Sequence, residues 1–151
     1  MTRFRRLSFE ELNELEKEFV EFLILNGVDA DTWVSIKSND PGNADKIIDQ
    51  FSDVVFASIF RKAEFVDVVT ATKIKCFHFQ KDQVVLVGID SVDYKTNFME
   101  AGLDELKDQE YDVYTTQKSY SKSREEEMFK MISNGGELSD GKLFKKICLA
   151  L

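Results

Sequence analysis

The stretch from residue 64 to residue 90 constrains the fold of this chain more than any other. It is rich in Val, Ile and Phe, which suit the pleated, half-buried surface of a sheet. Its breaks fall at residues 70–72 and 81–82, and such short connections favour hairpins. The sequence therefore predicts three consecutive antiparallel strands, at residues 64–69, 73–80 and 83–89.

The second hairpin has a register that follows from its turn. If residues 81–82 form the turn, Phe79 faces Val84 and Phe77 faces Leu86. Phe77 then lies at the centre of an apolar face, and we expect it to be a core residue.

The first hairpin is assigned a turn at residues 70–72. Asp67 then faces Lys75, and Glu64 faces His78. Both pairs bring opposite charges together, which stabilises neighbouring strands. This register therefore predicts that Val66 and Val68 share a face with Cys76, and that Phe65 shares a face with Phe77.

Both faces of the predicted sheet are apolar at their centres, whereas a sheet with one wet face alternates apolar and polar residues. Something should therefore cover each side. The fold class that follows is α+β: a small, mostly antiparallel sheet covered by helices on both faces, with a possible fourth strand at about 110–117.

Segments with a helical period surround the sheet. Ser8 and Glu11 have the spacing of a capping box, and Gly27 should end the first helix. Ser139 is the expected cap of the last helix. The expected helices are 9–26, a short helix carrying Trp33, 44–62, a short helix near 98–108, one ending near 133, and 139–151. The helix at 44–62 should cover one sheet face, and the last two helices should cover the other.

The composition excludes several classes of protein. The chain of 151 residues has a net charge of −8, which opposes broad binding to nucleic acid or anionic membranes. The two cysteines are too few for a disulfide framework, and no run is apolar enough for a signal peptide or membrane span. We expect a cytoplasmic protein with a single globular domain over residues 1–151.

Several short motifs look like caps and core positions. They are Arg5-Arg6-Leu7, Glu10-Glu11-Leu12, residues 15–19, Trp33 and residues 138–144. Together these motifs resemble a family of short Bacteroidota proteins of unknown function, and the resemblance implies a grouping and no activity.

No pattern for catalysis, cofactor binding or metal binding stands out. Cys76 and the single histidine, His78, share a face, but a metal requires three or four ligands. We therefore expect His78 to be structural, paired with Glu64. Residues 134–136 read as a helix stop and not as a phosphate loop.

The hypothesis that fits best is a non-catalytic module that binds another protein or a second copy of itself. Its expected interface residues are apolar positions beside the main stripe of the first helix, together with the nearby tryptophan: Val20, Ile24, Leu25 and Trp33. If Ile24 packs against Trp33, it supports the monomer; if not, it is free for another chain.

Two alternatives stay open. One is a nucleic-acid-associated regulator that uses a C-terminal helix–turn–helix-like hairpin and the basic side chains of Arg3, Arg5, Arg6, Lys142, Lys145 and Lys146. A pair of carboxylates could also serve an unrecognised hydrolase without any motif.

Overall fold

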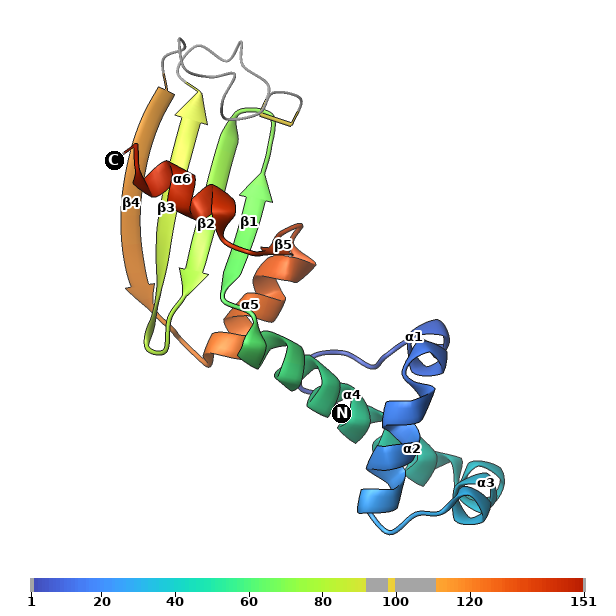
Figure 1. The fold of residues 1–151 in the computed structure, drawn as a ribbon. Helices are drawn as coiled ribbons and strands as arrows, with labels where there is room; N and C mark the ends of the chain where they lie inside the picture. The colour runs from blue at the N-terminus through green and yellow to red at the C-terminus, as the bar shows by residue number, and fades with distance from the viewer. Residues whose placement is uncertain (1, 92–97, 100–110, 151) are drawn as a thin grey trace. The chain divides into compact units, whose positions relative to one another are not determined.

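The computed structural model describes residues 2–91, 98–99 and 111–150, and these residues form two compact units. The units are Met1–Ile59 and Phe60–Leu151 (Figure 1). The single-domain organisation stays a prediction.

The first unit is helical, and its first predicted helix is in fact two. Ser8 accepts a hydrogen bond from the Glu11 N–H while Glu11 reaches back to the Ser8 N–H, which confirms the capping box. The helix is interrupted at Leu15, whose φ of −104° and ψ of 24° are not helical. The helices are α1 (Phe9–Glu14), α2 (Glu16–Leu25), α3 (Ala30–Asn39) and α4 (Pro41–Lys62), the last of which extends into the second unit.

Aromatic rings form the core of the first unit. The ring centroid of Phe51 on α4 lies 4.9 Å from that of Phe19 and 5.3 Å from that of Phe22. The ring centroid of Phe19 also lies 5.2 Å from that of Trp33 on α3. Phe51 of α4 thus belongs to the core of this unit. That the helix predicted from residues 44–62 covers a sheet face stays a prediction.

The second unit contains a five-stranded antiparallel sheet in the order β4-β3-β2-β1-β5. The three-strand prediction and the fourth strand are confirmed, and the fifth strand was not predicted. The strands are β1 (Phe65–Val69), β2 (Lys73–Phe79), β3 (Gln83–Ser91), β4 (Tyr111–Ser119) and β5 (Glu137–Ser139).

The register between β2 and β3 is as predicted, with Phe79 opposite Val84 and Phe77 opposite Leu86. Phe77 is nevertheless only half-buried, whereas Phe79 is 2% exposed. The expectation that Phe77 lies in the core is therefore wrong, and Phe79 is the central aromatic residue of this hairpin.

The predicted register between β1 and β2 is wrong by one residue. Asp67 lies opposite Cys76 and not Lys75, and Phe65, not Glu64, lies opposite His78.

The cause of the slip is the turn. The Thr70 N–H donates to the Lys73 carbonyl at 2.8 Å, and the Lys73 N–H donates to Thr70 Oγ1 at 3.1 Å. Only two residues remain in the turn, and a one-residue slip exchanges the two faces of a strand. Phe65 and Asp67 therefore share the face of Cys76, while Val66 points to the other side.

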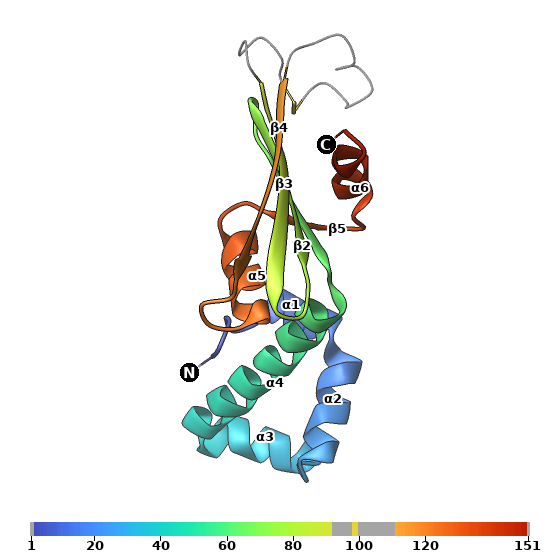
Figure 2. The same ribbon diagram turned by 90° about the vertical axis from the view of Figure 1, so that its left-hand side faces the viewer.

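Helices cover both sheet faces, as predicted, but the two C-terminal helices do not lie together. Figure 2 shows α5 (Arg124–Ser133) and α6 (Lys142–Cys148) on opposite faces. Ile147 of α6 packs into the cluster that contains Cys76 and Ile89. The prediction that both helices cover one face is wrong because β5, between them, pairs with β1 and carries the chain across the edge of the sheet.

The last helix also begins later than predicted. Ser139 belongs to β5, and the residue before α6 is Gly141, at φ +83°, with no side-chain cap.

Of the predicted helix near 98–108, only Phe98 and Met99 fall among the described residues, where they form a turn. Within the described part of the chain, no helix has the length and hydropathy needed to cross a membrane.

Candidate functional site

Three apolar side chains on α2 are exposed. Val20 is 47%, Ile24 62% and Leu25 86% accessible, whereas Phe19 and Leu23 of the same helix are buried. Trp33 packs against Phe19 and does not bury Ile24. We call Val20, Ile24 and Leu25 the α2 patch.

Three glutamates and one lysine share the exposed part of α2 with the α2 patch. Glu16, Glu18 and Glu21 lie on the same helix, and all three are exposed. A helix that presents apolar side chains among carboxylates can enter an apolar groove whose rim is basic. The patch therefore has the chemistry of a docking surface and contains no group that could catalyse a reaction.

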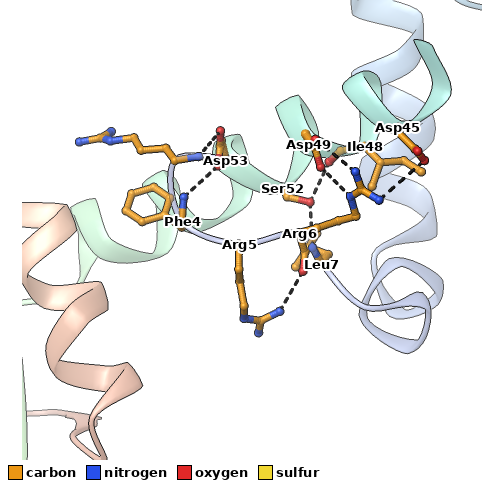
Figure 3. A network of polar contacts seen from close by, with 10 residues as sticks. Phe4, Arg5, Arg6, Leu7, Asp45, Ile48, Asp49, Ser52 and Asp53 are labelled. Atoms are coloured by element: carbon orange, nitrogen blue, oxygen red, sulfur yellow. Dashed lines mark hydrogen bonds and ion pairs between the residues drawn. The ribbon is translucent and has the colours of Figure 1, made fainter. Parts of the chain in front are cut away.

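The N-terminal segment lies along α4 in a polar network (Figure 3). The Leu7 N–H donates to Ser52 Oγ at 2.9 Å, and Ser52 Oγ in turn donates to the Ile48 carbonyl at 2.7 Å. Arg6 Nε donates to Asp49 at 2.6 Å, and Asp45 lies 3.7 Å from the same guanidinium. Arg6 is thus used to hold the segment on the helix.

The other two N-terminal arginines take part in the same anchoring. The Arg3 N–H donates to both carboxylate oxygens of Asp53 at 2.9 Å. Arg5 forms two hydrogen bonds with Glu11, at 2.8 and 2.9 Å, and these hold the pKa of Glu11 down to about 2. The guanidiniums of Arg5 and Arg6 therefore have carboxylate partners within the chain, a use that competes with binding to phosphate.

The C-terminal lysines do not lie on a helix–turn–helix. Because α5 and α6 occupy opposite sheet faces with β5 between them, they do not form a helical hairpin (Figure 2). Lys142 is 3.6 Å from Asp140, Lys145 lies over the Phe65 ring at 5.9 Å, and Lys146 is exposed.

A hollow of about 320 Å³ lies at the β1 and β5 side of the sheet, and two of its lining residues are acidic. Asp67 of β1 is directly opposite Glu137 of β5. Burial raises the pKa of Asp67, the charges of Asp140 and Glu137 add to this, and the nearby Cys76 thiol and Ser139 hydroxyl counteract it. The sequence did not reveal this hollow, because β5 was not predicted and Asp67 was placed opposite Lys75.

Cys76 and His78, on the same face, lack the surroundings of a reactive site. Burial raises the pKa of the Cys76 thiol, and the Asp67 charge adds to the effect, so the thiol stays protonated at neutral pH. His78 stacks on Phe65 at 4.5 Å and lies 4.0 Å from Glu64. Among the residues with described positions, no three His, Cys, Asp or Glu side chains converge as metal ligands would.

Comparison with known proteins gives a grouping. The model of a family of unknown function, DUF6495, matches residues 1–151. No curated protein and no solved structure matches the chain.

Proposed function

Since the chain belongs to DUF6495, a family of unknown function, we propose from the geometry that it is a non-catalytic protein-interaction module. Its docking surface is the α2 patch, and its partner is a protein with an apolar groove and a basic rim. The family membership agrees with the resemblance drawn from the sequence, and the Bacteroidota origin stays a prediction.

The observation that carries this proposal is the exposure of Ile24 and Leu25, at 62% and 86%. Apolar side chains that packed within the chain would be covered. Adjacent apolar side chains that stay exposed on a protein surface mark interaction sites. The spacing of Val20 and Ile24, four residues apart, places them on one side of α2. Such a pair is the usual anchor of a helix in a groove.

The charge of the chain also favours a basic protein partner. The net charge of −8 and the glutamates around the α2 patch attract cations and oppose phosphate. A cytoplasmic location is part of the proposal, and nucleic acid is not an expected partner. The regulator and hydrolase alternatives remain hypotheses without a supporting site among the described residues.

The test is affinity purification of the tagged full chain from its native cell, followed by mass spectrometry. Three forms are compared: wild type, Ile24→Glu with Leu25→Glu, and the control Val34→Glu. Val34 lies on α3 and is 57% exposed, so the control places a charge at another exposed apolar position of the same unit. Any recovered protein is then purified and titrated by calorimetry.

The expected result is a partner that wild type and Val34→Glu bind equally and the double variant binds at least tenfold more weakly. The melting temperature of all three forms should be nearly equal, because the three positions are exposed. Binding that the double variant retains, or recovery of nucleic acid without a protein, would contradict the proposal.

A further inference from the structure

The outer edge of β4 has backbone groups that are not used in the sheet. β4 is an edge strand, and all nine of its residues pair with β3 on one side. The Ser91 N–H donates to the Thr72 carbonyl, and the Gln80 N–H donates to the Gln83 carbonyl. The odd-numbered residues of β3 therefore bond to the β2 side. Antiparallel strands alternate their bonding direction, so the intervening residues of β3 bond to β4.

It follows which backbone groups of β4 point outward. The β4 residues that lie opposite Val84, Leu86, Gly88 and Asp90 form backbone hydrogen bonds with β3. The β4 residues between them do not, and their backbone groups point away from β3. Within the described ranges, these alternate residues have no further strand beside them. The residues with outward N–H and carbonyl groups are Tyr111, Val113, Thr115, Gln117 and Ser119.

The charges on β4 favour a cation beside its outer edge. Asp112 lies directly opposite Asp90 of β3, and like charges at such positions destabilise a strand pair. Asp90 Oδ1 is buried and has no hydrogen-bond partner among the described residues. A positive charge on the free side of Asp112 would offset this repulsion.

The chain itself carries such a charge at the matching position. Lys118 lies on the same face of β4 as Asp112, because the two are an even number of residues apart. Its side chain is 68% exposed. If two copies of β4 run antiparallel about a twofold axis at Thr115, residue 112 of each copy faces residue 118 of the other. This register also pairs all nine residues of the strand, and a shift of the axis by one residue loses both the full overlap and the charge match.

We propose that β4 pairs with β4 of a second copy about this axis, so that Asp112 of each chain meets Lys118 of the other across a continuous sheet. The backbone bonds come from the five residues with outward groups, Tyr111, Val113, Thr115, Gln117 and Ser119. Asp112 and Lys118 then form a non-hydrogen-bonded pair, in which side chains approach most closely.

Glu127 does not prevent this pairing. Its Oε2 is 3.5 Å from Lys118 Nζ, and its Oε1 accepts hydrogen bonds from the Ser121 N–H at 2.6 Å and Ser121 Oγ at 3.0 Å. Glu127 therefore keeps a partner when Lys118 turns toward the second copy. The self-pairing uses the second unit and is independent of the α2 patch.

The test exchanges the charges. Asp112→Lys places two lysines opposite each other in a homodimer, and Lys118→Asp places two aspartates there. Mixing the two variants makes both cross-strand pairs opposite in sign again. Asp112→Lys also faces Asp90 within its own chain, so its monomer should melt no lower than wild type. Weakened association of this variant thus cannot be explained by unfolding.

Sedimentation equilibrium of the full chain over a concentration series measures the outcome. We expect wild type to dimerise, each variant alone to associate roughly tenfold more weakly, and the equimolar mixture to regain the wild-type affinity. Hydrogen exchange of wild type should show concentration-dependent protection of the Val113, Thr115 and Gln117 amides.

Three results would overturn the proposal. They are a wild-type chain that stays monomeric at millimolar concentration, a dimer whose affinity neither variant changes, or amides of β4 whose exchange does not depend on concentration.

Discussion

The ring of Tyr114 on β4 lies across Gly88 of β3, in the space that a Cβ at position 88 would occupy. The two residues are directly paired, and the ring covers backbone that glycine leaves bare. The pKa of Tyr114 is raised by burial and by the nearby Asp90 carboxylate. Glycine at position 88 is therefore a packing requirement set by one residue of the neighbouring strand.

The first prediction concerns this pair. Gly88→Ala should lower the free energy of unfolding by about 1–3 kcal/mol, because the methyl group meets the Tyr114 ring. In a Tyr114→Ala background the same change should cost far less, since the obstacle is gone. Chemical denaturation of the double-mutant cycle measures the coupling, and additive effects would show that the ring does not lie over Gly88.

Arg124 is expected to be a major stabilising residue of the second unit. Its guanidinium donates to the Phe60 carbonyl at 2.6 Å, to the Ala63 carbonyl and to the Phe79 carbonyl at 3.2 Å. Arg124→Met should cost at least ~2 kcal/mol, because it removes all the charge-assisted hydrogen bonds that the guanidinium donates to part-buried carbonyls. Arg61→Met, at an exposed position of α4, is the control and should change the unfolding free energy by less than ~0.5 kcal/mol.

Phe79 and Phe77 should differ in their contribution to stability. Phe79 is 2% exposed, and Phe79→Ala should cost about 3–5 kcal/mol. Phe77 is half-buried, so Phe77→Ala should cost clearly less. Urea denaturation of both variants measures the two losses of unfolding free energy. Equal losses would mean that the Phe77 side chain is more buried than the structure shows.

Asp67→Asn should raise the stability at neutral pH. Because burial raises the pKa of Asp67 above the ordinary 3.8, the folded state bears a cost whenever the carboxyl is ionised. That cost is complete above the folded-state pKa and disappears as the pH falls through it toward 3.8. Denaturation at pH 7 and pH 4 should therefore show that Asp67→Asn gains less unfolding free energy at the lower pH. Asp140→Asn is a control for which the opposite change is expected, because hydrogen bonding to the Lys142 N–H lowers the pKa of Asp140.

Glu11 should give the opposite pH dependence. Its pKa is lowered from 4.5 to about 2, first by the hydrogen bonds of Arg5 and next by the Ser8 N–H. Its stabilising contribution is complete above pH 4.5 and should be lost as the pH falls from there toward 2. Arg5→Gln should remove most of this dependence, whereas an unchanged acid profile would show that the pair does not form in solution.

Local sequence signals determined much of this fold. The capping box at Ser8 needs only residues within one turn, and the register of β2 with β3 follows from a two-residue connection. The fourth strand follows from period-two alternation. The exposed positions of the α2 patch also followed from the helical period, because they lie beside the apolar stripe of their own helix.

Features that depend on distant residues were decided by the tertiary structure alone. β5 has only three residues, and it exists because β1 offers an edge to pair with. That pairing separates α5 from α6 and places Glu137 opposite Asp67. The observed β1–β2 register differs from the predicted one because a side-chain hydrogen bond of Thr70 shortens the turn. The charge pairs that favour the predicted register are too weak to outweigh this turn. Strand pairing joins residues far apart in the chain, so its outcome depends on which edges the folded sheet leaves open.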